Sequence, residues 1–543
     1  MLLLTLSIAA AFAVLAYGVS WVLVDYARVL RLRRKMAPGP LPYPLFGNIF
    51  MIPTSRQWEK FEEWSIKYQS PIITIWDGHT PVVVCNDSWS ISNLCDKRAN
   101  IYSSRAVKTL TGKVFGLHKF NQAGLPYGDQ WRLHRRLTHS AANPQVVKLY
   151  RNTQANEAKV FIDDCLNDPN KLVESALRFT VSIVSIIAWD RRISSEADTV
   201  LKVAQAFVGS ANNGFPGKTY TEAIPILAQM PAWLNPLPNQ LRKLATTSNK
   251  YFYALCVEAA DAPQDNFAKR LLKEKEEHGL SKVEISNLTG NFIGAGVDTT
   301  TSTLLTFIMA ICLNPDVQRK AHDEIDRVIG PEKYPDWTDE ENLPYLAAII
   351  SETLRWRPAF SLGGPPHAPV EDDIYNGYLF PKGTAIIGNL YAISRNSREY
   401  PQPDRFWPER FLDGFDRPDY PNRKGHNVFG WGRRVCSGEA LAQQSLYLTI
   451  LFMLWAFEIR PGLDDQGNEV ALDPNAYTAS QVTRPMPFKL RLLPRSTTIV
   501  DLVKQGAAKA RSELRDFDFE TKVTFENAQS VSLDMPIAHS EKS

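Results

Sequence analysis

The stretch FGWGRRVCSG at residues 429–438 places one cysteine among three glycines and two adjacent arginines. Glycine lets a backbone turn approach a bulky, flat partner closely. The residues that follow, 438–457, have the apolar spacing of a helix, so Cys436 is predicted to lie just before a helix N-terminus. The helix dipole and the free N–H groups at such a position favour a thiolate.

A single thiolate with no other metal-ligating side chain beside it indicates a haem iron ligand. Arg434 is then expected to bind a haem propionate through a charge-assisted hydrogen bond. The other cysteines form no C-x-x-C pair and are sparse, which argues against a zinc site and against a disulfide framework. They are predicted to be small buried hydrophobic side chains: Cys85, Cys95, Cys165, Cys256 and Cys312.

The composition is that of an ordinary globular protein. The chain has 543 residues, of which 44% are hydrophobic and 22% charged. A net charge of +3, without a basic patch interleaved with aromatic residues, argues against a nucleic-acid partner.

The N-terminus predicts a membrane anchor. Residues 1–24 are apolar and uncharged, which is long enough as a helix to cross a hydrocarbon core of ~30 Å. Asp25 ends the run, and the basic segment 28–35 follows it. Because the positive charge lies on the C-terminal side, the rest of the chain is expected to stay in the cytosol. The alternative is a cleaved signal peptide, for which the run is long and the basic flank is on the wrong side.

Four segments are predicted along the chain. Residues 1–27 form the transmembrane anchor, 28–48 a basic and proline-rich hinge, 49–496 one catalytic domain, and 497–543 a C-terminal helix with a polar tail that is disordered at its end. Residues 71–76, 81–85 and 372–388 have β-rich patterns, whereas 304–330 and 343–356 have helical spacing. The expected fold is therefore mainly α with small β-sheets.

The cysteine stretch resembles the haem-binding loop of the cytochrome P450 family. The matching residues are Phe429, Gly432, Arg434, Cys436 and Gly438. The resemblance implies the cytochrome P450 fold, a monooxygenase activity and a haem b cofactor whose iron has Cys436 as its axial ligand. The last residues of the domain, 484–496, together with the helix after them, resemble those of fungal microsomal members.

A second motif, SETLR at residues 351–355, places Glu352 and Arg355 on one helix face. Alone it would be an ordinary surface ion pair. With FWPERF at 406–411, the resemblance implies a structural network of Glu352, Arg355 and Arg410 that supports the cysteine loop.

A third motif, GAGVDTTTS at residues 294–302, lies within an apolar helical stretch. Its small residues would let the helix run close over a flat ring. The resemblance assigns Asp298 to proton delivery and Thr299 to stabilising the reduced-oxygen species. The alternative is a solvent-exposed Asp-Thr pair on an amphipathic helix.

A fourth motif, YGDQWRLHRR at residues 127–136, places Trp131 and Arg135 on one helix face. They resemble the family's haem-propionate partners. His367, in GGPPHAP, matches another such position, although a lone histidine is more often an ordinary core or surface residue.

The resemblance implies a monooxygenase that uses O2 and two electrons. The chain has no flavin or iron–sulfur motif, so the electrons must come from another protein. An NADPH-cytochrome P450 reductase on the endoplasmic reticulum membrane is expected, with cytochrome b5 as a second donor. The alternatives are a haem-thiolate isomerase or dehydratase, which often departs from the acid–alcohol pair, and a non-catalytic haem-binding sensor or carrier.

The substrate is predicted to be a small apolar or aromatic molecule, such as a polyketide or terpenoid secondary metabolite. The predicted pocket walls, taken by position in the family fold, are rich in aromatic residues. Some of these aromatics could equally belong to the core: Phe115, Phe120, Phe207, Phe215, Phe360 and Tyr477.

Overall fold

The structure is a computed structural model of the chain. It describes residues 2–195, 197–210, 216–414, 416, 418–518 and 521–534. The end of the polar tail, 535–543, for which disorder was predicted, lies outside the described residues.

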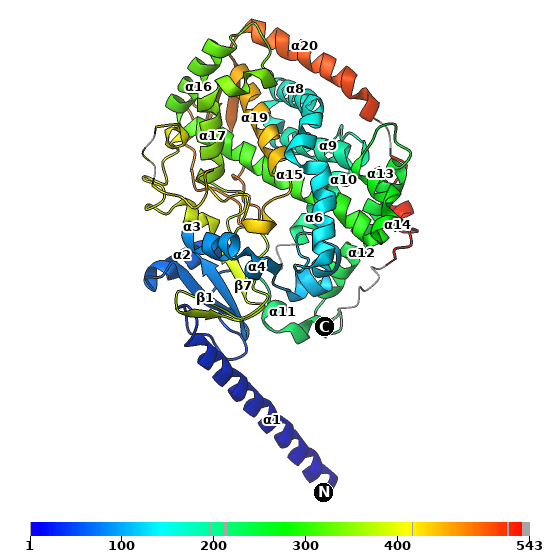
Figure 1. The fold of residues 1–543 in the computed structure, drawn as a ribbon, viewed down its shortest axis with the longest axis vertical. Coiled ribbons are helices and arrows are strands. Elements are labelled where there is room, and N and C mark those ends of the chain that lie inside the picture. The colour runs from blue at the N-terminus through cyan, green and yellow to red at the C-terminus, as the bar shows by residue number, and fades with distance from the viewer. Residues whose placement is uncertain are drawn as a thin grey trace.

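The fold is mainly helical, as predicted (Figure 1). Short 3-10 and π turns link the α-helices. The α-helices are α1 (Leu2–Arg33), α2 (Gln57–Lys67), α3 (Ser88–Ser92), α4 (Ala99–Tyr102), α5 (Leu117–Phe120), α6 (Asp129–Ala142), α7 (Pro144–Val147), α8 (Arg151–Asn167), α9 (Leu172–Trp189), α10 (Thr199–Ser210), α11 (Tyr220–Ala223), α12 (Leu237–Ala259), α13 (Phe267–Lys273), α14 (Lys275–His278), α15 (Lys282–Leu313), α16 (Pro315–Val328), α17 (Pro344–Trp356), α18 (Leu390–Ser394), α19 (Glu439–Ala456), α20 (Thr497–Glu513) and α21 (Phe525–Ala528).

Helix α15 runs through the middle of the helical body (Figure 1). A capping box starts it, because Ser281 accepts a hydrogen bond from the backbone of Glu284 and the Glu284 carboxylate accepts one from the backbone of Ser281. The helix packs on α9, α10 and α12, and its buried residues join the largest hydrophobic cluster of the molecule. The helical stretch predicted over 304–330 is two helices, because Pro315 cannot donate a backbone hydrogen bond and begins α16.

A five-stranded sheet forms a separate layer beside the helices. Its strand order is β1-β2-β7-β4-β3, with β2 and β7 parallel and the other pairs antiparallel. Within it His367 pairs with Arg105 on one side and with Ile386 on the other. The strands are β1 (Ile72–Asp77), β2 (Thr80–Cys85), β3 (Ser104–Arg105), β4 (His367–Ala368) and β7 (Ala385–Gly388), and two-stranded sheets are formed by β5 (Asp373–Tyr375) with β6 (Tyr378–Phe380) and by β8 (Phe457–Pro461) with β9 (Leu490–Pro494).

Helix α1 projects from the sheet side of the body as a free rod (Figure 1). Three helices among the described residues are long and apolar enough to span a membrane, and two of them, Pro169–Trp189 and Lys282–Leu313, are mostly buried within the body. The window in Leu3–Arg33 has no buried residue, so α1 is the candidate membrane span.

The segment predicted as a hinge packs on the sheet layer. Helix α1 continues to Arg33, whose guanidinium donates to the carbonyl of Gly39 at 2.7 Å. The backbone N–H of Thr74 donates to the carbonyl of Pro38, and a Cβ at Gly39 would lie 1.9 Å from the Thr74 oxygen. These contacts hold the end of α1 and the segment after it against β1.

Residues 497–518 and 521–534 form a C-terminal strap over the helical body. The buried face of α20 packs on α8, and Arg511 binds Asp163 and Asp164 of that helix at 2.6 and 3.1 Å. Further along, Thr521 donates to Glu258 of α12, and the Asp534 carboxylate accepts the first backbone N–H of α15. The strap thus joins α8, α12 and the start of α15.

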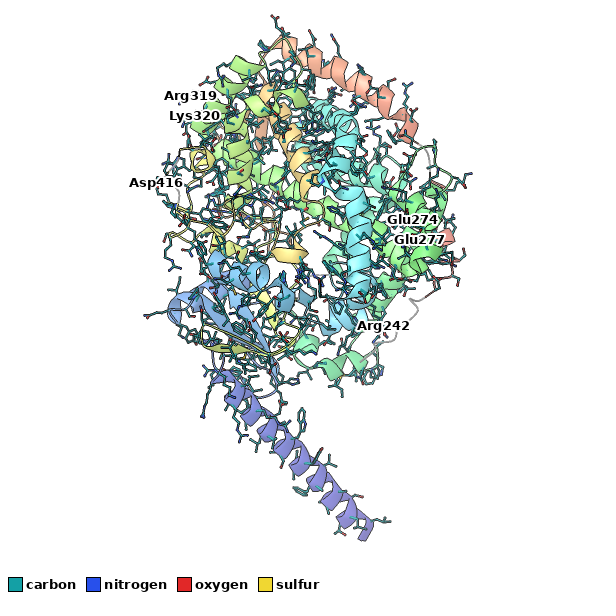
Figure 2. The ribbon with its side chains drawn as sticks, in the orientation of Figure 1. Arg242, Glu274, Glu277, Arg319, Lys320 and Asp416 are labelled. Atoms are coloured by element: carbon teal, nitrogen blue, oxygen red, sulfur yellow. The ribbon has the colours of Figure 1, made fainter. Side chains whose placement is uncertain are left out.

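Charged side chains lie at the periphery of the body. Figure 2 shows Arg319 and Lys320 on the outer side of α16, with Glu274 and Glu277 near α14 on the opposite side. The interior is left to the apolar clusters and to a few buried polar networks.

Candidate active site

The loop that carries Cys436 is a tight turn closed by its own backbone. The N–H of Cys436 donates to the carbonyl of Phe429 at 2.8 Å, and α19 begins at Glu439 as predicted. At Gly432 the backbone has φ of 54°, and a Cβ there would lie 2.1 Å from the carbonyl oxygen of Cys95. Only glycine fits that contact, which explains one residue of the motif.

Cys436 is the one exposed cysteine among the described residues, and the other five are buried, as predicted. Its side chain lines a cavity of about 340 Å³ between the cysteine loop, α15, α6 and the sheet layer. Although the side chain is accessible from the cavity, the surrounding protein desolvates the Cys436 thiol and raises its pKa, and a hydrogen bond from the N–H of Gly438 opposes that rise. A cationic centre in the cavity would favour the thiolate.

Three arginines line this cavity without a carboxylate partner among the described residues: Arg105, Arg135 and Arg434. Arg434 donates only to the carbonyls of Ser103, Gln122 and Leu125. Burial, together with the charges of the two other arginines, lowers the pKa of Arg434 to about 8. Burial also lowers the pKa of Arg105 to about 10 and the pKa of Arg135. This charge arrangement fits a dianionic group such as the two propionates of haem.

Trp131 and His367, the two other predicted propionate partners, lie beside these arginines. The guanidinium carbon of Arg434 is 4.3 Å from the centre of a Trp131 ring. The Nδ1 of His367 is 2.9 Å from the carbonyl oxygen of Tyr102, which makes Nδ1 the donor. Burial, and then the charge of Arg105, lowers the pKa of His367, whereas an anion in the cavity would raise it.

Helix α15 forms the opposite wall. Thr299 and Ala295 line the cavity, and the Thr299 hydroxyl donates to the carbonyl of Ala295 at 2.8 Å. Asp298 is half-buried beside Thr299 but is not among the lining residues. Burial raises the pKa of Asp298, and the positive charge of Arg484 opposes that rise. Of the predicted pair, Thr299 therefore lines the cavity, whereas Asp298 does not.

Glu352, Arg355 and Arg410 form the buried network implied by the resemblance. The Glu352 carboxylate accepts from Arg355 at 2.6 and 2.9 Å and from Arg410 at 3.2 Å, and all three side chains are fully buried. The same carboxylate accepts the N–H of Trp407, while Arg355 also donates to carbonyls of residues 394, 403 and 405. The network holds the irregular segment 394–411 against α17 and does not line the cavity.

Comparison with known proteins decides the family of this site. The cytochrome P450 family model matches residues 37–487, which is most of the chain. The chain belongs to the cytochrome P450 family.

Curated relatives agree with this assignment. The chain is 32% identical to cytochrome P450 monooxygenase 58 of Postia placenta, over 90% of this chain and 94% of the relative. It is 31% identical to the echilunin cytochrome P450 monooxygenase of Aspergillus ruber, over 83% of each chain. The protein is therefore a haem-thiolate P450 monooxygenase, with a lipophilic substrate and a redox partner.

The P450 site contains residues that the sequence analysis missed. Arg105 comes from the two-residue strand β3, and its guanidinium donates to the carbonyls of Pro365 and Ala123. The hydroxyl of Ser437 accepts from Arg135 at 2.6 Å and from Gln122 at 3.2 Å. Arg105 and Gln122 carry no local sequence signal, because sheet pairing and loop packing bring them to the site, whereas Ser437 lies within the quoted stretch 429–438.

The predicted aromatic pocket walls are confirmed only at Phe360, which lines the cavity. Phe115 and Phe207 pack on each other with ring centres 5.3 Å apart, and Phe120 is buried. The hydroxyl of Tyr477 donates to Thr306, and Phe215 lies outside the described residues. The alternative that several of these aromatics belong to the core holds for Phe115, Phe120 and Phe207.

Proposed function

We propose that Cys436 supplies the thiolate that binds haem iron in this P450, and that Arg105, Arg135, Arg434, Trp131 and His367 hold the haem propionates. The observation that carries the proposal is the cluster of three cationic side chains without a carboxylate partner among the described residues, in the cavity that the Cys436 sulfur faces. Phe429, Gly432 and Gly438 shape the loop, and Gly438 supplies the N–H that favours the thiolate.

Haem, when bound, supplies the oxygen activation and the hydroxylation of a C–H bond. The chain supplies the positioning and the protons. The hydroxyl of Thr299 lies at the cavity wall, and it can turn from the Ala295 carbonyl towards the cavity and relay a proton there. Burial raises the pKa of Asp298, which favours its uptake of a proton that it can pass to that hydroxyl. The positive charge of Arg484 opposes that rise and so favours release of the proton.

The substrate is a small apolar or aromatic molecule, of the polyketide or terpenoid kind. The wall near α15 supports this class, because Phe292, Ala295 and Phe360 give it an apolar surface. The similarity to an echilunin-named P450 of Aspergillus ruber supports a secondary-metabolite pathway.

The electron donor is an NADPH-cytochrome P450 reductase, with cytochrome b5 as a second donor. The chain sits in the endoplasmic reticulum membrane through α1, with the catalytic domain in the cytosol. This orientation is supported by the basic residues after the apolar run, which favour the cytosolic side: Arg28, Arg31, Arg33, Arg34 and Lys35.

The test is the spectrum of the reduced protein with carbon monoxide. Wild type is expected to give the red-shifted Soret band of an anionic sulfur ligand, and Cys436→Ala is expected to lose it. Cys312→Ala is the matched control, because this buried cysteine in α15 lies outside the cavity. The assignment would be refuted if Cys436→Ala kept the band. It would also be refuted if Cys312→Ala lost the band while Cys436→Ala kept it.

A further inference from the structure

Four asparagines form a chain of side-chain amides from α12 to the cavity. The amide of Asn287 donates to Asn249 at 2.9 Å. The amide of Asn121 donates to Asn287 at 3.1 Å and to Asn291 at 2.8 Å. Asn249, Asn287 and Asn121 are buried, whereas Asn291 lines the cavity.

Backbone contacts fix which way each amide points. The N–H of Ala123 donates to the oxygen of Asn121, so the amino group of Asn121 must face the other asparagines. The amino group of Asn287 donates to the carbonyl of Val283 as well as to Asn249, so its oxygen must face Asn121. Both N–H bonds of Asn121 are then directed at oxygens, one on Asn287 and one on Asn291.

The direction of these hydrogen bonds also fixes Asn291, because its side-chain oxygen accepts from the amino group of Asn121. Its amino group therefore has two N–H bonds left, and no acceptor for them exists among the described residues. The side chain is half-buried at the cavity wall, next to the apolar ring of Phe292. A donor without a partner in an apolar wall selects a ligand that brings an acceptor oxygen, because burying an unpaired donor is costly.

The position of Asn291 adds a length requirement. Asn291 and Thr299 lie on the same helix about two turns apart, which corresponds to ~12 Å along the axis. A ligand that reaches both would carry its acceptor oxygen at one end and the reacting carbon at the other.

We propose that Asn291 is a specificity-determining residue that donates a hydrogen bond to an acceptor oxygen of the substrate. The substrate class is an apolar molecule with a carbonyl, ether or hydroxyl oxygen at the end remote from the oxidised carbon. Asn121, Asn287 and Asn249 are positioning residues that keep the donor directed at the cavity. The inference rests on the proposed haem site, since that site fixes where the reacting carbon lies.

The test uses two iron-binding probes of matched shape, 1-(4-acetylphenyl)imidazole and 1-(4-ethylphenyl)imidazole. Their free imidazole nitrogen binds haem iron, and only the first has an acceptor oxygen at its far end. Binding is followed by the shift of the Soret band in titrations of the haem-loaded protein. Wild type is expected to bind the acetyl probe more tightly than the ethyl probe, by about three- to tenfold.

Two variants locate the effect. Asn291→Leu removes the donor, and Asn291→Asp keeps an oxygen for Asn121 while replacing the donor with an acceptor. Both are expected to bind the two probes equally or to prefer the ethyl probe. Asn314→Asp is the matched control at the other end of α15, outside the cavity, and is expected to keep the wild-type preference.

The outcomes separate this inference from the haem assignment. No preference in wild type, or an unchanged preference in Asn291→Asp, would overturn the role of Asn291 while the Soret shift with the ethyl probe still supports the haem site. A purified protein that gives no Soret shift with either probe would overturn the haem site itself, and the inference with it.

Discussion

At the residue scale, Thr299 provides the alcohol of the cavity wall. Its hydroxyl is held by the carbonyl of Ala295, one turn earlier in α15. Replacing Thr299 by Ala is expected to keep haem binding but to release reduced oxygen as peroxide, because proton delivery is no longer directed. Product per NADPH should fall by roughly tenfold or more.

Thr299→Ser is the conservative control, because it keeps the hydroxyl. Product and hydrogen peroxide are measured together with NADPH consumption in the reconstituted system. An unchanged product yield in Thr299→Ala would remove Thr299 from the proposed proton route.

Glu399 gives a second residue-scale prediction, about pH. It is 2% exposed, and burial raises its pKa to about 7, with Asp87 adding to the rise and Ser88 opposing it. The folded state therefore binds a proton more tightly than the unfolded state. The free energy of unfolding should fall by up to about 3 kcal/mol as the pH rises from about 4.5 to about 7.

Urea denaturation at several pH values measures this effect. Glu399→Gln cannot titrate and should flatten the pH dependence in that window. If wild type and Glu399→Gln show the same slope against pH, Glu399 does not carry the effect.

At the element scale, the Glu352 network joins α17 to the irregular segment that leads to the cysteine loop. Glu352 is the only carboxylate that contacts Arg355 or Arg410 among the described ion pairs. Glu352→Gln leaves two arginine charges buried without a counter-charge. It should lower the free energy of unfolding by ~3–5 kcal/mol.

The matched control is the surface pair of Lys320 and Glu409, 2.5 Å apart, with Lys320 at the outer side of α16 in Figure 2. Lys320→Gln should change stability by less than about 1 kcal/mol. Chemical denaturation compares the two variants. Equal effects would show that burial adds nothing to the Glu352 network.

The sequence predicts those elements that are determined by residues close together in the chain. Three features predict structure from neighbouring residues alone. They are the helical spacing of apolar residues before Pro315, the strand patterns at 71–85 and the glycine at 432. The parallel pairing of β2 with β7 has no such local signal, because it joins segments about 300 residues apart. For the same reason Arg105 was missed, since only the pairing of β3 with β4 places it beside His367.

At the scale of the whole molecule, the N-terminal part of α1 projects away from the catalytic body, whereas its last residues pack on the sheet layer. Its N-terminal part is exposed, and contacts with the body begin near Tyr26, whose hydroxyl donates to the carbonyl of Pro42 at 2.9 Å. Deleting residues 2–24 should therefore release the protein from membranes without loss of the carbon monoxide spectrum. Fractionation by centrifugation, with the full-length chain as the control, checks this expectation.

A truncated protein that remains in the membrane fraction would show that other surfaces of the body also bind the bilayer. A truncated protein that leaves the membrane but loses haem would show that α1 supports the fold of the sheet layer.

The C-terminal strap has a consequence for the order of events during synthesis. The strap is synthesised after α8, α12 and α15, yet it covers α8 and contacts α12 and the start of α15. Nascent chains fold as they emerge, N-terminal parts first. The parts of these three helices that the strap contacts thus stay exposed to water until the strap itself has been synthesised and has emerged from the ribosome.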